Sequence, residues 1–289
     1  ILIDKNEYKG VWRAATNLQN DAMQVTGATP ELINQPSVKR AIIVGSIDQS
    51  EWIKKLIATK KIDGKELKGK REKYILQTIA NPFEGMDEAV VIAGSDKRGT
   101  IYGIYELSEQ MGVSPWYYWA DVPVQKHPTI SIKAGSYTDG EPAVRYRGLF
   151  LNDEAPCLTS WVKNTFGTEY GGHKFYEKVF ELILRLRGNY LWPAMWGWSF
   201  YADDPLNSPT ADEMGIIMGT SHHEPMARNH QEWARNRKEY GTWDYATNQK
   251  VIDKFFREGM ERAKNTEDLI TIGMRGDGDT AMGGKEGHD

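Results

Sequence analysis

The fold of this chain is decided by the stretch Gly215-Ile216-Ile217-Met218-Gly219-Thr220-Ser221-His222-His223-Glu224. Its apolar first half is typical of a short buried strand, and polar residues follow where that strand would end. Three other short apolar runs in the second half of the chain end in the same way. Polar residues gathered after the carboxyl ends of buried parallel strands are typical of one face of a (β/α) barrel. The stretch therefore predicts parallel strands whose polar ends form a single site.

The pattern of strand, polar end and helix occurs four times from Arg145 onward. We expect strands at 146–151, 189–191, 215–219 and 269–273, with helices over 173–187 and around 251–263. This alternation predicts a parallel sheet with right-handed crossovers. A closed barrel needs eight units and about 250 residues, whereas about 145 residues remain here, so we expect the first half of a (β/α)8 barrel.

Half a barrel leaves apolar strand edges uncovered, which promotes aggregation. We therefore expect the chain to be a truncated piece of a longer protein. The alternative is a four-stranded open sheet that a partner completes.

The first half of the chain, residues 1–140, is expected to be a separate α/β domain. Strands are predicted at 41–45, 74–79 and 89–94. Ser50 is placed to cap one helix, and Gly112 to end a second helix that follows Gly99. The segment 134–142 is rich in glycine and proline and is predicted to be a linker. Residues 141–289 then form the barrel portion.

Composition excludes several classes of protein. The 289 residues are 40% hydrophobic and carry a formal net charge of -4. No basic block suggests a nucleic acid partner, and no apolar run is long enough to span a membrane. The single cysteine, Cys157, rules out an internal disulfide. The lysine-rich segment 60–73 is interpreted as an exposed turn whose charges are solvated.

A basic loop, Ser95-Asp96-Lys97-Arg98-Gly99, lies between a predicted strand and a predicted helix. Such a loop can hold a phosphate at the helix N-terminus. However, there is no G-x-G-x-x-G and no Lys-Ser/Thr pair after the second glycine, so no nucleotide or other cofactor is predicted. Arg98 is interpreted as a surface arginine, with a carboxylate of a neighbouring domain as the alternative partner.

The predicted strand ends bring polar and aromatic residues to one edge, namely Asn152, Asp153, Trp192 or Trp196, His222, Glu224, Arg275, Asp277 and Asp279. Two carboxylates can hydrolyse a glycosidic bond, one as the acid and one as the base that activates water. An arginine with a histidine can bind a negatively charged sugar. Tryptophans can stack on sugar rings, although aromatic residues also fill protein cores. This edge predicts a glycoside hydrolase.

The pair His222-His223 followed by Glu224 also suggests a metal site. In an extended segment, however, adjacent side chains point in opposite directions, and Pro225 favours an extended residue before it. No H-E-x-x-H motif is present, so no metal ligand is predicted. One of His223 and Glu224 is expected to face the pocket, and the other to pack into its wall.

Four segments together resemble family 115 of the glycoside hydrolases, the xylan α-1,2-glucuronidases: Arg147–Glu154, Asn189–Trp196, Gly219–Met226 and Gly273–Asp279. Asp96–Ser108 and Trp119–Val124 are similar as well. The resemblance implies a multidomain enzyme with an α/β N-terminal domain, a (β/α)8 barrel and C-terminal domains. It also implies removal of glucuronic acid, or its 4-O-methyl ether, from glucuronoxylan or its oligosaccharides with inversion. A homodimer of the full-length protein and a secreted or periplasmic location are further implications.

The same resemblance assigns roles to single residues. Asn152, Asp153, Trp196, His222 and Arg275 would line the uronic acid pocket, and Asp279 would be a catalytic carboxylate or lie beside one. From their place at the predicted edge, Glu224 and Asp277 are expected to be further substrate-binding residues. Because inversion needs two carboxylates, Asp153 is the best catalytic partner for Asp279 in this chain. Other functional residues of the family lie on strands beyond Asp289, so the isolated chain is expected to be inactive.

Two other functions fit single features of the sequence. The paired histidines suggest a metal-dependent barrel hydrolase, and the tryptophans suggest a non-catalytic carbohydrate-binding protein.

Overall fold

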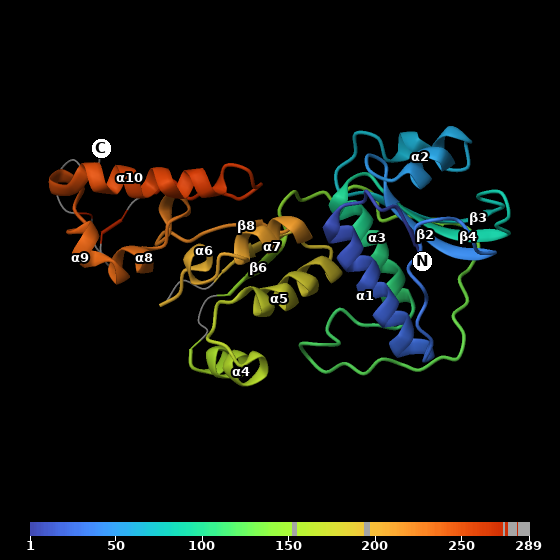
Figure 1. Cartoon of the computed structure of the whole chain (residues 1–289), viewed down its shortest axis with the longest axis horizontal. Helices are drawn as coiled ribbons and strands as arrows, with labels where there is room; N and C mark the ends of the chain where they lie inside the picture. The colour runs from blue at the N-terminus through green and yellow to red at the C-terminus, as the bar shows by residue number, and fades with distance from the viewer. Residues whose placement is uncertain (152–154, 194–196, 274, 277–281, 283–289) are drawn as a thin grey trace. The chain divides into compact units, whose positions relative to one another are not determined.

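The computed structural model describes residues 1–151, 155–193, 197–273, 275–276 and 282. They belong to two compact units. The first consists of Ile1–Tyr146 with Leu184–Gly188 and Glu213–Gly215, and the second of Arg147–Ile183, Asn189–Asp212 and Ile216–Asp289. Both units mix helices and strands, which confirms the α/β class (Figure 1). Among the described residues, no helix is long and apolar enough to cross a membrane.

The first unit is built on a five-stranded sheet. Its strands, in spatial order, are β1 (Leu2–Ile3), β2 (Arg40–Ser46), β4 (Glu88–Gly94), β3 (Tyr74–Ala80) and β5 (Ser136–Tyr137). The first three are parallel, whereas β3 and β5 run antiparallel to their neighbours. β5 lies within the segment that was predicted to be a linker. It forms because β3 would otherwise leave backbone groups unpaired at the sheet edge.

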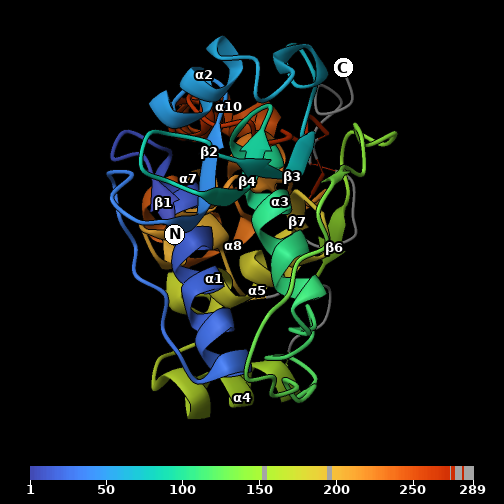
Figure 2. The ribbon, with the colours of Figure 1, turned by 90° about the vertical axis from the view of Figure 1, so that its right-hand side faces the viewer.

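Helices cover both faces of this sheet. α1 (Lys9–Thr26) and α3 (Lys97–Gln110) lie side by side on one face, and α2 (Glu51–Ala58) lies on the other (Figures 1 and 2). The strand alternation explains the two faces, because successive side chains point in opposite directions. Val91 packs with residues of α2, whereas Ile92 meets α3 at Gly103. α1 has no counterpart among the sequence predictions.

Side chains cap the N-termini of α2, α3 and one 3-10 turn in the first unit. The Ser50 side chain accepts a hydrogen bond from the Ile53 backbone N–H at 3.4 Å, which confirms the predicted cap of α2. The Asp96 carboxylate accepts from the Gly99 N–H at 2.8 Å and begins α3. A short 3-10 turn, η1 (Gly64–Glu66), begins at Asp63 in the same way.

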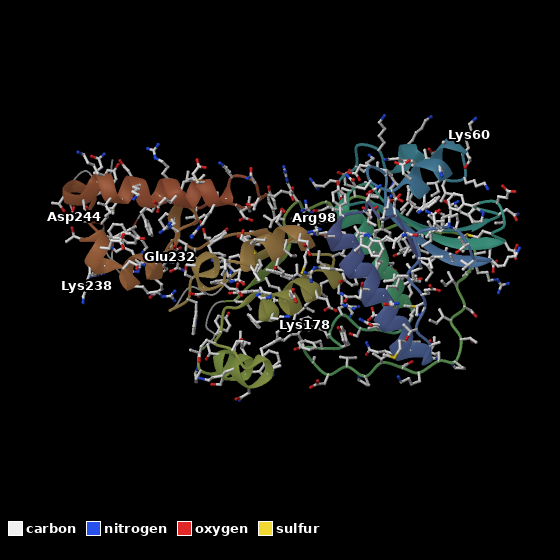
Figure 3. All side chains as sticks on the ribbon, viewed as in Figure 1. Lys60, Arg98, Lys178, Glu232, Lys238 and Asp244 are labelled. Carbon is white, nitrogen blue, oxygen red and sulfur yellow. The ribbon has the colours of Figure 1, made fainter. Side chains whose placement is uncertain are left out.

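The interpretation of Arg98 as a surface residue was wrong. Its side chain is 12% exposed, and its Nε donates to Glu72 Oε1 at 2.7 Å (Figure 3). The Glu72 side chain is 0% exposed, and a buried carboxylate of this kind requires a charged partner. Glu72 belongs to the first unit and lies two residues before β3.

The second unit carries a parallel sheet of β6 (Gly148–Phe150), β7 (Tyr190–Trp192) and β8 (Ile217–Met218), in that order. A parallel bridge between Gly219 and Leu269 continues the series. In the described residues, the predicted strand at 269–273 is represented by this bridge. The order agrees with right-handed strand and helix units that follow one another along the chain.

The helices of the second unit are α4 (Cys157–Phe166), α5 (His173–Arg185), α6 (Phe200–Asp203), α7 (Asn207–Met214), α8 (His230–Arg235), α9 (Arg237–Tyr240) and α10 (Tyr245–Ala263), with a 3-10 turn, η2 (Pro225–Ala227). α5 has the apolar stripe predicted for it, and Phe175, Tyr176, Val179 and Phe180 are buried. Trp233 of α8 and Phe255 of α10 pack edge to face, with ring centroids 5.1 Å apart. This packing holds the segment after β8 against α10.

Candidate active site

The carboxyl ends of the parallel strands meet at one edge. The Leu151 N–H donates to the Trp192 carbonyl at 2.9 Å, and the Gly219 N–H donates to the Leu191 carbonyl at 2.9 Å. The Leu269 N–H donates to the Met218 carbonyl at 2.8 Å. Residues that follow these positions therefore leave the sheet at the same edge, as the sequence pattern requires.

The segment after β8 is a turn and not an extended strand end. His222 and His223 occupy the turn, and their ring centroids lie 4.3 Å apart. The His223 N–H donates to Ser221 Oγ at 3.0 Å. The argument that adjacent side chains must point in opposite directions was therefore wrong here, because it assumed an extended backbone.

His223 and Arg275 form the central pair of the site. Arg275 Nη1 lies 2.9 Å from His223 Nε2, and both residues are half-buried. Because a guanidinium can only donate, His223 Nε2 must accept, which places the imidazole proton on Nδ1 in this contact. The sequence reasoning paired Arg275 with His222, which is exposed.

Two neighbours hold this pair in place. Trp243 Nε1 donates to the Arg275 carbonyl at 2.7 Å, and the His230 N–H donates to the His223 carbonyl at 3.1 Å. The Trp243 and His230 rings meet edge to face, with centroids 5.9 Å apart. The two residues that present the pair are thus joined through a single aromatic contact.

Glu224 is buried in the wall below the turn. It is 1% exposed. Asn229 Nδ2 donates to its Oε1 at 2.5 Å, and the Ser221 N–H donates to its Oε2 at 3.3 Å. Burial raises the pKa of Glu224 to about 7, although these hydrogen bonds oppose the shift. The carboxyl holds the His222–His223 turn to the start of α8.

A buried ionic network supports Glu224 from the other side. Asn229 and Glu232 form a capping box at the start of α8. Arg262 Nη2 donates to Glu232 Oε1 at 2.6 Å, and Arg228 Nε lies 3.2 Å from Glu232 Oε2 (Glu232 is labelled in Figure 3). Burial alone would raise the pKa of Glu232, but the hydrogen bond and charge of Arg262 outweigh it, and the pKa is lowered.

The sequence reasoning missed these supporting residues. The pattern Asn229-x-x-Glu232 is a capping-box signal and could have identified the helix start. Arg228 lies four residues before Glu232 and is a local partner, whereas Arg262 gives no such signal, because it reaches Glu232 from α10.

Several predicted site residues lie outside the described residues: Asn152, Asp153, Trp196, Asp277 and Asp279. Their roles stay predictions. Trp192, the alternative to Trp196, is described and stacks on Phe150 with ring centroids 4.3 Å apart. Within the described ranges, no group of three or more His, Cys, Asp or Glu residues is arranged to hold a metal ion.

The class of protein follows from these features and from comparison with known families. The profile of Glycosyl hydrolase family 115 matches residues 139–289, which include the whole candidate site. The profile of the Glycosyl hydrolase family 67 N-terminus matches residues 1–107. The chain therefore belongs to glycosyl hydrolase family 115, as the sequence motifs indicated.

A solved structure supports the same assignment. It is a family 115 4-O-methyl-α-glucuronidase with specificity for decorated arabinogalactans. It is 34% identical to this chain, with a TM-score of 0.82 over 98% of the chain and 36% of the glucuronidase. The chain thus spans about a third of the length of that enzyme.

A second solved structure, CpGH84D, is 8% identical, with a TM-score of 0.46 over 90% of this chain and 38% of its own. A search of curated proteins gave no match.

Proposed function

We propose that this chain contributes to an α-glucuronidase, a hydrolase that releases glucuronic acid or its 4-O-methyl ether from a polysaccharide. The observation that carries the proposal is the His223–Arg275 pair at the carboxyl edge of the parallel strands. A uronic acid differs from a neutral sugar by its carboxylate. A guanidinium recognises a carboxylate through charge-assisted hydrogen bonds, often two at once.

The contact within the pair supports different roles for its two residues, with Arg275 binding the carboxylate and His223 orienting Arg275. His223 accepts from one nitrogen of Arg275, and this contact limits the directions that the guanidinium plane can take. A guanidinium has five N–H donors in a fixed planar fork, so its orientation decides which carboxylate geometry it can bind. We assign His223 to orienting Arg275, and Glu224 to holding the turn that presents His223.

We propose Asp279 and Asp153 as the acid and base of an inverting hydrolysis. In the sequence, Asp153 comes two residues after Leu151, and Asp279 comes four residues after Arg275. Inversion requires the two carboxyl groups to be roughly 6.5–9.5 Å apart, so that water fits between base and sugar. Asn152, Trp196, His222 and Asp277 are proposed to bind the substrate around them.

The polysaccharide that carries the uronic acid is a separate question. The sequence resemblance favours glucuronoxylan, whereas the similar solved structure is named for decorated arabinogalactans. The His223–Arg275 pair recognises the uronic acid and not the backbone sugar. We propose glucuronoxylan or its oligosaccharides as the substrate and decorated arabinogalactan as the competing one.

Both substrates can be tested in one assay. The purified protein that contains this chain is expected to release uronic acid from at least one polymer. Arg275→Ala should lower kcat/KM at least 100-fold, and Arg275→Lys should not restore it, because an ammonium lacks the planar fork. Binding of either polymer without release of uronic acid would overturn the proposal in favour of a carbohydrate-binding protein.

A further inference from the structure

A pocket of about 810 Å³ opens in the first unit, between the C-terminal end of α2 and η1. Three isoleucines, Ile47, Ile57 and Ile62, form its apolar part. Polar and small residues complete the lining: Asp48, Lys54, Ala58, Lys60, Asp63, Gly64, Lys65 and Lys68. We call it the lysine pocket. A concave apolar floor with a few charged groups around it is the usual form of a small-ligand site.

Some charged groups around the lysine pocket have hydrogen-bond or ion-pair partners among the described residues, and others do not. The Asp63 carboxylate accepts from the Lys65 backbone N–H at 2.9 Å, and Asp48 accepts from the Tyr8 hydroxyl at 2.5 Å. Lys54 is paired with Glu51 at 2.9 Å. In the described part of the chain, the ammonium groups of Lys60, Lys65 and Lys68 form no ion pair or hydrogen bond, and all three lysines are exposed (Lys60 is labelled in Figure 3). Three cations therefore surround an apolar floor and remain available to an anion.

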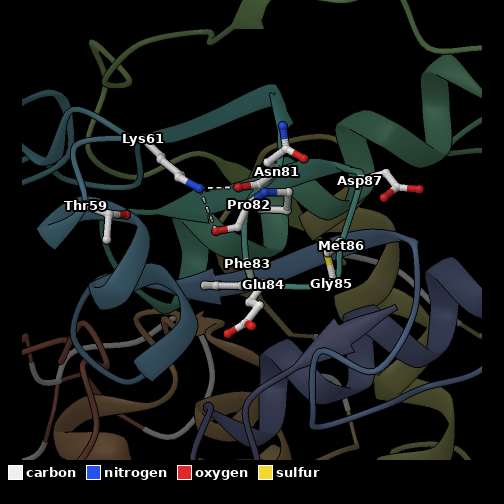
Figure 4. A pocket seen from close by; sticks show the side chains of 9 residues that line it. All are labelled: Thr59, Lys61, Asn81, Pro82, Phe83, Glu84, Gly85, Met86 and Asp87. Carbon is white, nitrogen blue, oxygen red and sulfur yellow. Dashed lines mark hydrogen bonds between the residues drawn. The ribbon is translucent and has the colours of Figure 1, made fainter.

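A neighbouring pocket provides a comparison, because its lysine has hydrogen-bond partners. This second pocket, of about 470 Å³, is lined in part by Lys61, Asn81 and Pro82 (Figure 4). Lys61 Nζ donates to the backbone carbonyls of both other residues. Two acids, Glu84 and Asp87, also line this pocket. Lys61 therefore already has hydrogen-bond acceptors, and two acids line the second pocket, so this pocket is not suited to bind an anion.

We propose that the lysine pocket is a non-catalytic binding site for a uronic acid side chain of an oligosaccharide. Lys60, Lys65 and Lys68 would hold the carboxylate, and the isoleucine floor would contact the sugar C–H face or a 4-O-methyl group. This assignment rests on the proposed function, which makes uronic acid side chains the substrate. Such a site would keep the protein on the decorated polymer between hydrolytic events.

The features of the pocket favour this ligand over other anions. The lining contains no aromatic side chain on which a nucleic acid base could stack. The chain carries a net charge of -4, which disfavours a long polyanion of high charge density. A methylated uronic acid combines a single negative charge with an apolar surface, and the pocket offers the complement of both.

The test is binding of 4-O-methylglucuronosyl xylotriose to the purified protein that contains this chain, measured by calorimetry. It is carried out with the Arg275→Ala variant, so that the candidate active site does not contribute. Replacing Lys60, Lys65 and Lys68 together by Gln should weaken binding at least tenfold. The matched control replaces Lys133, Lys174 and Lys250 by Gln, which removes the same charge from exposed lysines outside the pocket and should leave binding within twofold.

A second variant tests the pocket itself. Ala58→Trp fills the space above the isoleucines and keeps every lysine, so it should also weaken binding at least tenfold. Xylotriose, which has no carboxylate, should not compete with 4-O-methylglucuronosyl xylotriose for the pocket. The proposal is overturned if the triple lysine variant binds like the control. It is also overturned if Ala58→Trp has no effect, because the lysines would then act as an open charged surface.

The outcomes separate this inference from the proposed function. With Arg275 retained, the lysine variants should release uronic acid from short oligosaccharides at the normal rate while losing retention on glucuronoxylan in affinity gels. A protein that binds through the lysine pocket but releases no uronic acid would contradict the proposed function alone. A protein that releases uronic acid with no binding in the Arg275→Ala background would contradict the inference alone.

Discussion

Glu224 stands out at the residue scale because its buried carboxyl has a pKa of about 7, against an ordinary value of 4.5. Between these values the folded chain binds more protons than the unfolded chain. The free energy of unfolding should therefore fall as pH rises from about 4.5 to about 7, by on the order of 3 kcal/mol. Below that window the contribution is fully present, and above it the contribution is lost.

Glu224→Gln tests this pH dependence. The amide resembles the protonated carboxyl and cannot ionise, so the variant should show a flatter stability profile between pH 5 and 7. Urea unfolding at a series of pH values measures the difference. Glu239→Gln, an exposed carboxylate of α9, is the control and should keep the wild-type slope. A wild-type slope in Glu224→Gln would contradict the assignment.

The two adjacent histidines make different contacts, and this difference is also testable. His223 contacts Arg275 directly, whereas His222 is exposed and lies beside the His223 ring. If His223 orients the guanidinium, His223→Ala should lower kcat/KM on uronic acid substrates at least tenfold more than His222→Ala. His223→Gln, which retains an acceptor, should recover part of the loss. Equal losses would contradict the assignment of His223 to orienting Arg275.

At the scale of elements, α10 packs closely against the segment that follows β8. A Cβ atom at Gly259 would lie 2.1 Å from the Met226 carbonyl oxygen. Gly to Ala within a helix normally stabilises it by about 1 kcal/mol. Here Gly259→Ala should instead destabilise the fold, by about 1–3 kcal/mol, because a backbone atom must move.

Denaturant unfolding measures that change. The neighbouring Met260 is exposed, so Met260→Ala should change stability by less than about 0.5 kcal/mol. A stabilised Gly259→Ala variant would show that α10 and η2 are further apart than described here.

At the scale of the whole molecule, residues far apart in sequence complete the first unit. Arg185 and Asp21 form two hydrogen bonds of 2.9 and 3.1 Å, and both side chains are buried. The Arg185 guanidinium also lies 4.6 Å from the Tyr105 ring centroid. Removing one partner of such a pair leaves an uncompensated buried charge.

A double-mutant cycle tests the pair. Asp21→Ala and Arg185→Ala should each cost about 3–5 kcal/mol, and the double variant should cost clearly less than the sum. Thermal or urea unfolding of all four proteins gives the coupling energy. Additive losses would mean that the pair contributes little to the first unit.

Metal removal addresses the alternative chemistry for the whole site. If hydrolysis relies on two carboxylates, a chelator should leave the release of uronic acid unchanged within twofold. Elemental analysis of the active protein is the companion measurement. A rate that falls with chelator and returns with added metal would favour the metal-dependent hydrolase.

Local patterns account for what could be predicted. The strands β2, β3 and β4 were predicted because each is a short apolar run, and the Ser50 cap because it uses a neighbouring backbone donor. The meeting of the parallel strand ends at one edge was predicted because alternating strands and helices are compatible with only a few sheet topologies. The family was recognisable because its motifs are contiguous.

The amino-acid sequence by itself determined the α/β class, the main strands and the family. Only the tertiary structure decided that Arg275 meets His223 and that Arg98 and Arg185 are buried partners of Glu72 and Asp21. The reason is physical: strands, helices and caps arise from interactions within a few residues, which local patterns record. A buried charge finds its partner across tens to hundreds of residues, and only the folded chain brings the two together.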